Sequence, residues 1–251
     1  MRRMRVAPSA IALILSVAVA LSGCSGLQDR EAPTAAQAPD PALAQDQVVG
    51  LVRPSVLKIR AEAKSCNKLL SGTGFVVGKN RVLTNAHVVA GGDAVTVENG
   101  DKDSAARVVS FDPDADIAVL DVPDLAAPPL VLAGYEAKSG AEALVLGFPG
   151  AGEFAAMPAR IREVNNLDGP NIYQTTNVIR PVYIYTVAGE REFHGGSGSP
   201  LIDMTGRVLG VVFGNDVQNA TTGFALTSAK TATLLPADDA YEPVATGACL
   251  S

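Results

Sequence analysis

Between residues 56 and 227 the chain alternates short apolar runs with turn-forming residues, and this alternation limits the possible folds more than any other feature. The runs are rich in Val, Ile and Leu, and Gly, Pro, Asn or Asp separates them. Short strands spaced in this way are typical of an antiparallel sandwich or barrel. The 24 Gly and 16 Pro also disfavour long helices. We therefore expect an all-β fold with a packed hydrophobic core.

About a dozen strands are predicted from these runs. They are expected at residues 56–59, 74–78, 81–84, 94–97, 107–111, 117–121, 142–146, 157–164, 172–176, 178–185, 200–202, 208–213 and 222–226. Residues 78–80 have the composition of a hairpin turn. Two short helices are expected, one at residues 46–55 and one at residues 227–235 with Thr227 or Ser228 as its N-cap.

The start of the chain resembles a bacterial lipoprotein leader. Three arginines among the first five residues precede an apolar run at residues 11–21. The run is shorter than the roughly 20 residues of a membrane span and has the length found in signal peptides. It ends in Leu21-Ser22-Gly23-Cys24, which resembles the lipobox in which the Cys is lipidated. We expect residues 1–23 to be removed and lipid on Cys24 to hold the exported protein at the outer side of the cytoplasmic membrane. The alternative is an ordinary cleaved leader with an incidental Cys.

The rest of the chain divides into a stalk and a folded part. Residues 24–45 contain almost no large apolar residue, so a flexible stalk is expected there. A Pro- and Ala-rich stretch at residues 125–129 is the expected seam within the folded part. The predicted halves are residues 46–126 and 127–251.

Two cysteines remain, Cys66 and Cys249. In an exported protein they are expected to pair, and the alternative is two reduced, buried thiols. Such a bridge would close a long loop and stabilise the fold by roughly 5 kcal/mol in the chain-entropy account.

The charge balance is acidic. The chain has 20 Lys and Arg against 26 Asp and Glu, for a net charge of −6, and three of the basic residues lie in the leader. An acidic surface disfavours nucleic acid and anionic lipid as primary partners. We therefore expect no nucleic-acid partner.

The two histidines narrow the possible chemistry. Neither His87 nor His194 lies in an HExxH motif or another dense ligand cluster, so no metal site and no cofactor are expected. Residues 74–80 match a phosphate-binding loop only superficially, because three residues rather than four separate the glycines and Asn replaces Ser or Thr. Nucleophilic serine chemistry remains.

The order of Ser, His and Asp along the chain distinguishes the folds that use a serine nucleophile. No His follows Ser197, which excludes the α/β-hydrolase order. The subtilisin order needs an Asp before His87, where Asp occurs only in the expected stalk or at its edge. The order His, then Asp, then Ser is left.

Three motifs in this order resemble those around the triad of chymotrypsin-fold serine proteases of the trypsin-like and HtrA type, most of all the actinobacterial periplasmic ones. They are Thr84-Asn85-Ala86-His87-Val88-Val89, Asp116-Ile117-Ala118-Val119-Leu120 and Gly195-Gly196-Ser197-Gly198-Ser199-Pro200-Leu201. The resemblance runs from about Ser55 to Cys249. It implies two six-stranded antiparallel β-barrels with a short C-terminal helix and an active site in a cleft between the barrels.

The resemblance also assigns roles to residues. Ser197 would be the nucleophile, His87 the general base and then acid, and Asp116 the carboxylate that orients the imidazole. Asp112 and Asp114 are rivals for the last role, and Asp116 is preferred because it leads directly into the strand expected at residues 117–121.

The glycine-rich turn implies an oxyanion hole made by the N–H groups of Gly195 and Ser197. By analogy with the family, the resemblance implies that the pocket for the residue before the scissile bond lies near Arg191, His194, Phe213, Gly214 and Asn215. A basic floor at Arg191 would select acidic side chains, although a solvated Arg191 fits the sequence equally well.

The resemblance implies a cofactor-independent serine endopeptidase that cleaves cell-envelope proteins through an acyl-enzyme intermediate. A catalytically silent protease-fold protein that binds envelope proteins is the first alternative, and the intact His, Asp and Ser argue against it. An esterase with the same triad is the second. The sequence gives no indication of the oligomeric state.

Overall fold

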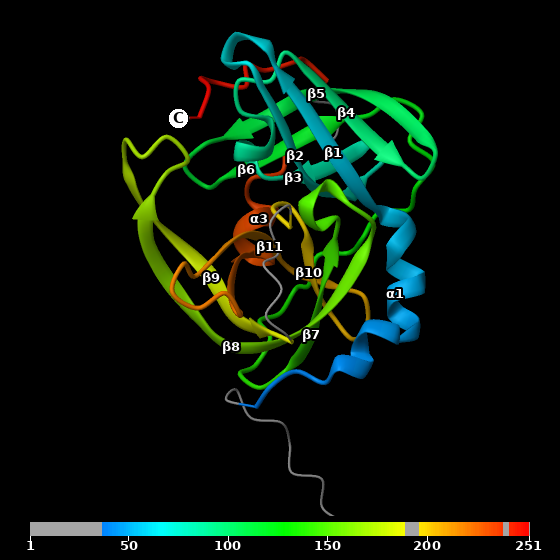
Figure 1. Ribbon diagram of the computed structural model, residues 1–251, viewed down its shortest axis with the longest axis vertical. Helices are drawn as coiled ribbons and strands as arrows, with labels where there is room; N and C mark the ends of the chain where they lie inside the picture. The colour runs from blue at the N-terminus through cyan, green and yellow to red at the C-terminus, as the bar shows by residue number, and fades with distance from the viewer. Residues whose placement is uncertain (1–36, 189–195, 238–240, 251) are drawn as a thin grey trace, which may run out of the picture. The chain divides into compact units, whose positions relative to one another are not determined.

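The computed structural model describes residues 37–188, 196–237 and 241–250, and twelve strands in these residues form two closed antiparallel barrels (Figure 1). The first barrel, in the order β1-β2-β3-β6-β5-β4, consists of β1 (Val56–Ala63), β2 (Lys68–Gly78), β3 (Arg81–Thr84), β4 (Ala94–Asn99), β5 (Lys102–Asp112) and β6 (Ile117–Asp121). The second, in the order β10-β11-β12-β9-β8-β7, consists of β7 (Glu142–Gly147), β8 (Ala155–Pro170), β9 (Asn177–Val187), β10 (Pro200–Asp203), β11 (Val208–Asn215) and β12 (Thr222–Thr227). The expected all-β, two-barrel fold is confirmed.

The helices are short, as expected. The α-helices are α1 (Gln47–Val52), α2 (Ala86–Val89) and α3 (Ser228–Ala232), and the 3-10 turns are η1 (Pro41–Gln45), η2 (Arg53–Ser55), η3 (Lys64–Cys66) and η4 (Pro149–Ala151). Asp46 caps α1 by accepting a hydrogen bond from the Val48 N–H at 2.9 Å, and Thr227 caps α3. No helix in the described residues is long and apolar enough to span a membrane.

Two hairpins illustrate how far local patterns determine the strands. The β2–β3 hairpin turns at the expected place, where Asn80 adopts a left-handed φ of 59°. The strand expected at residues 172–176 is wrong, because these residues form the loop of the β8–β9 hairpin. There the side-chain carbonyl of Asn171 accepts from the N–H groups of Tyr173 and Thr175, and the Asn171 N–H donates to the Thr176 carbonyl. These local bonds close the loop and replace strand pairing.

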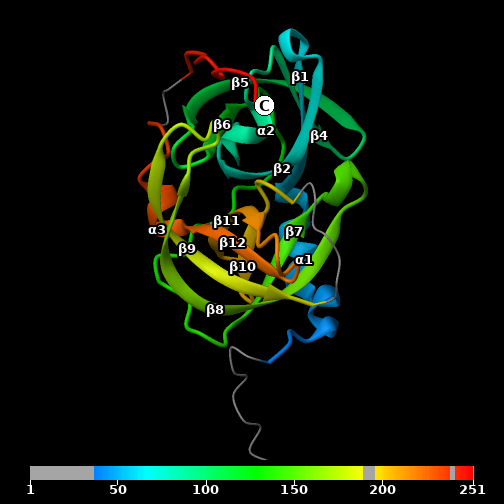
Figure 2. The same cartoon turned by 60° about the vertical axis from the view of Figure 1, so that its left-hand side comes forward.

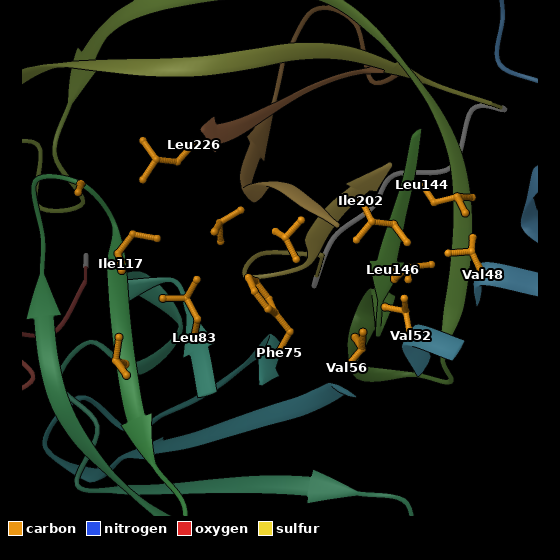
Figure 3. Close-up of a cluster of buried hydrophobic side chains, with 14 of the residues drawn as sticks. Val48, Val52, Val56, Phe75, Leu83, Ile117, Leu144, Leu146, Ile202 and Leu226 are labelled. Atoms are coloured by element: carbon orange, nitrogen blue, oxygen red, sulfur yellow. The ribbon is translucent and has the colours of Figure 1, made fainter. Parts of the chain in front are cut away.

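One apolar cluster is shared by the two barrels and α1 (Figure 3). Phe75, Leu83 and Ile117 contribute from the first barrel, and Leu144 and Leu146 are among those from the second. Two further apolar clusters lie within the barrels, one in the first and one in the second. The shared cluster therefore joins the barrels through apolar packing, the main favourable term in folding.

The segment before β1 lies against the second barrel. Val48 and Val52, one helical turn apart on α1, are buried in the shared cluster and lie beside Gly206 of the second barrel. The Arg160 guanidinium also donates to the Gln37 carbonyl at 3.1 Å. Residues 37–45, the last part of the expected stalk, are thus packed on β8 rather than extended away from it.

The C-terminal tail, residues 241–250, lies against the first barrel (Figure 2). The Val244 N–H donates to the Val108 carbonyl at 2.8 Å, and the Thr246 carbonyl accepts from the Gly91 N–H at 3.0 Å. Cys249 forms the expected disulfide with Cys66, with 6.0 Å between their Cα atoms. The tail that follows the second barrel is therefore covalently fixed to the first.

Candidate active site

His87 and Asp116 form a directly hydrogen-bonded pair. His87 lies on α2, which follows β3, and Asp116 immediately precedes β6. The Nδ1 atom of the His87 ring lies 2.7 Å from Oδ2 of Asp116, and the His87 main-chain N–H donates to Oδ1 at 2.9 Å. Both carboxylate oxygens are therefore used to hold one residue, which fixes the orientation of the imidazole.

Asn85 holds the Asp116 backbone in an unusual conformation. Asp116 has a left-handed φ of 58°, which is uncommon for a residue other than glycine. The side-chain amide of fully buried Asn85 donates to the Asp116 carbonyl at 2.7 Å. The only sequence signal for this role of Asn85 is its position two residues before His87 in the first motif.

The other two acidic residues of this segment point elsewhere. The Asp112 carboxylate accepts from the main-chain N–H groups of Asp114 and Ala115. The Asp114 carboxylate accepts from the side chain of Asn171 at 2.9 Å. Of the three candidates, only Asp116 contacts His87.

The Asp116 carboxylate raises the pKa of the His87 imidazole above its ordinary value. Burial alone would lower this pKa, because it disfavours the charged ring. The charge of Asp116 and its hydrogen bond outweigh burial, since both favour the protonated form. The pair is thus suited to receive a proton on His87.

Ser197 lies on a tight turn before β10. Gly198, the next residue, has a φ of 83°, and a Cβ atom there would overlap the Thr73 carbonyl oxygen. The Ser197 carbonyl accepts from the Thr73 N–H at 2.8 Å, so the turn is held against β2. Only glycine fits at position 198.

Gly72 shows how closely the histidine helix approaches this turn. A Cβ atom added at Gly72 would lie 2.6 Å from Val88, the neighbour of His87, and 3.0 Å from the Ser197 carbonyl oxygen. The described residues include no hydrogen bond between the His87 ring and the Ser197 hydroxyl. In proteases without substrate this bond is often long.

A cavity of about 170 Å³ opens beside Ser197. Phe213, Gly214 and Asn215, three of the residues expected at the substrate pocket, line it together with Tyr185 and Met157. Its described lining residues carry no charged side chain. Arg191, His194 and Gly195 lie outside the described residues, as does Cys24.

Among residues 37–188, 196–237 and 241–250, no group of three or more His, Cys, Asp or Glu side chains is placed to hold a metal ion. What the arrangement offers is an oriented imidazole, a serine on a constrained turn and an adjoining cavity, which together suit nucleophilic chemistry.

Comparison with known proteins places these features in a family context. The profile of the trypsin-like peptidase domain matches residues 72–211. Serine protease Rv3671c (MarP) of Mycobacterium tuberculosis is 54% identical over 214 residues, which cover 85% of this chain and 53% of that protein. A probable periplasmic serine endoprotease, DegP-like, of Hahella chejuensis is 32% identical over 148 residues, or 56% of this chain and 29% of that protein. The chain thus spans about half the length of the Mycobacterium tuberculosis relative.

Solved structures of the same Mycobacterium tuberculosis protease are also similar to this chain. The active form of the Rv3671c protease from Mycobacterium tuberculosis superposes with a TM-score of 0.82 at 53% identity, covering 86% of this chain and 94% of that one. The inactive form gives a TM-score of 0.71 at 52% identity, covering 79% and 96%.

Proposed function

The chain belongs to the trypsin-like peptidase family, and from this we propose that it is a serine endopeptidase acting on cell-envelope proteins through Ser197, His87 and Asp116. The observation that carries the proposal is the two-point contact between His87 and Asp116 beside the Ser197 turn. A serine hydroxyl is inert at neutral pH unless a nearby base takes its proton, and an oriented imidazole supplies that base.

The reaction would proceed in two steps. The Ser197 Oγ attacks the peptide carbonyl while His87 takes the hydroxyl proton, and the imidazolium then gives this proton to the departing amine. Water, deprotonated by His87, then attacks the acyl group, and the imidazolium returns the proton to Ser197 Oγ as the product acid leaves. Asp116 stays ionised and stabilises the imidazolium in both steps. The Ser197 main-chain N–H, with that of Gly195, would stabilise the oxyanion.

Labelling with a fluorophosphonate probe tests the activated serine. We expect the oxidised wild type to be labelled and the Ser197→Ala and His87→Ala variants to remain unlabelled. Circular dichroism of all three proteins controls for folding. Labelling that persists in folded Ser197→Ala would place the nucleophile elsewhere, and a folded but unlabelled wild type would favour the catalytically silent binding protein.

Matched peptide and ester substrates separate an endopeptidase from an esterase. Cleavage of a denatured protein and of an internally quenched peptide is expected, with loss of both in Ser197→Ala. Hydrolysis of the ester alone would assign the same residues to esterase chemistry instead.

The proposed location is the outer side of the bacterial cytoplasmic membrane, with lipid on Cys24. The lipobox-like segment Leu21-Ser22-Gly23-Cys24 supports this, and the periplasmic assignment in the DegP-like relative's name agrees with it. Metabolic labelling with a fatty-acid analogue should mark the wild type and not Cys24→Ser. Equal labelling of the two would refute lipidation at this residue.

A further inference from the structure

A second cavity, of about 350 Å³, shares the lining residue Phe213 with the Ser197 cavity. His87 and Asp116 border it, and the β8–β9 hairpin supplies Arg180, Pro170 and other residues to its wall. This hairpin extends from the second barrel to the side of the first barrel where β6 lies, as both views show (Figures 1 and 2). The cavity is therefore built by segments of both barrels.

The Arg180 side chain in this wall is a nearly buried cation, only 5% exposed. Its Nε donates to the Asp114 carbonyl at 2.7 Å and its Nη2 to the Pro170 carbonyl at 2.8 Å. The guanidinium carbon lies 6.0 Å from the centre of the Phe213 ring. These contacts fix the side chain, so little conformational entropy remains to be lost when a ligand binds.

The Arg180 contacts leave its charge without an anionic partner. Carbonyl groups satisfy two of its nitrogens but do not neutralise it, and no carboxylate of the described residues lies within 4.0 Å of it. The Asp114 carboxylate accepts from Asn171 instead, and both Asp116 oxygens are held by His87. The described residues also provide no hydrogen-bond acceptor for Nη1. A buried cation in this state favours an incoming anion.

We propose that this cavity is a substrate subsite in which Arg180 selects a carboxylate side chain, Glu or Asp, upstream of the scissile bond. The inference rests on the proposed peptidase function. A peptide with one side chain in the Ser197 cavity must pass Phe213, which lines both cavities, so a preceding side chain can enter the second one. There Nη1 can donate a charge-assisted hydrogen bond to the carboxylate.

The test compares peptide pairs that differ only by Glu or Gln at the second, third or fourth residue before the scissile bond. These side chains have the same shape, so the ratio of their kcat/KM values reports charge recognition alone. At one of these positions we expect the wild type to prefer Glu by about tenfold or more. Arg180→Gln should bring this ratio to about one, and Arg180→Lys should retain part of it.

Asn171→Ala is the matched control. Asn171 lines the same cavity, and its replacement removes the bond to Asp114 and the loop bonds to Tyr173 and Thr175. It therefore perturbs the same hairpin and leaves the charge of Arg180 in place. If Arg180 acts on substrate, Asn171→Ala should lower both rates together and preserve the ratio. A merely structural Arg180 would instead make Arg180→Gln behave like Asn171→Ala, with both rates reduced and the ratio intact, which would overturn the inference.

The wild-type measurement also distinguishes failure of the subsite from failure of the peptidase function. Cleavage of the peptides with a Glu to Gln ratio of one at all three positions would refute the subsite and leave the peptidase function standing. No cleavage of any peptide, together with no fluorophosphonate labelling, would refute the peptidase function and the subsite with it.

Discussion

Removal of the Cys66–Cys249 disulfide should lower the free energy of unfolding by about 5 kcal/mol. The two cysteines are 183 residues apart, so in the unfolded state the disulfide closes most of the folded part of the chain into one loop. The loop-closure relation for this separation gives about 5 kcal/mol at 25 °C. For a protein of this size each kcal/mol moves the melting temperature by about 2–4 °C, so a drop of about 10–20 °C is expected.

Urea unfolding of the wild type and the Cys66→Ser/Cys249→Ser double variant measures this effect. Circular dichroism is the suitable probe, because the chain has no Trp. The variant should have a lower midpoint and a steeper dependence on urea, since an unfolded chain without the cross-link exposes more surface. Wild type treated with a thiol reductant should match the variant, and reductant should leave the variant unchanged.

A loss below about 1 kcal/mol would refute the reasoning. It would mean that the unfolded chain is already restricted to a similar degree without the bond, so that closing the loop costs little extra entropy. The hydrogen bonds of Val244 and Thr246 to the first barrel would then hold the tail by themselves.

Three further predictions concern the active site and the glycines. The kcat/KM value should fall as the pH is lowered, with a midpoint above about 6.5, because Asp116 outweighs burial and raises the pKa of His87. Asp116→Asn should move the midpoint of the residual activity downward. An unmoved midpoint would contradict the role of Asp116 in raising this pKa. Gly198→Ala should abolish fluorophosphonate labelling, because its methyl group would overlap the Thr73 carbonyl oxygen at a left-handed φ. Gly50→Ala, in open space on a helix, should raise the free energy of unfolding by up to about 1 kcal/mol in urea titrations and leave labelling unchanged.

Features that depend on neighbouring residues could be predicted from the sequence. The apolar spacing that includes Val48 and Val52 indicated α1, and the short apolar runs identified most strands. The loop at residues 172–176 was missed because its β-branched and aromatic residues favour a strand, whereas the side chain of Asn171 closes a turn there.

In the candidate site, too, residues in local sequence motifs could be predicted and residues with distant partners could not. His87, Asp116 and Ser197 each stand in a recognisable local motif, so the sequence could single them out. Arg180 could not be found, because its partner Asp114 is 66 residues away and only the folded hairpin brings them together. Polar positions whose partners come from distant strands have no local signature.

The two ends of the folded chain are exchanged between the barrels, and this has a consequence for cutting the protein. α1 precedes the first barrel but packs with the second, while the tail that follows the second barrel lies on the first. A chain divided at residues 123–129 would give two fragments, each lacking a segment that its own barrel requires and carrying the segment that the other needs. Each fragment alone should aggregate or unfold, and refolding the two together should restore a complete pair. An unbroken linker between the barrels should therefore not be needed for their association, because both ends of the chain already connect the two halves.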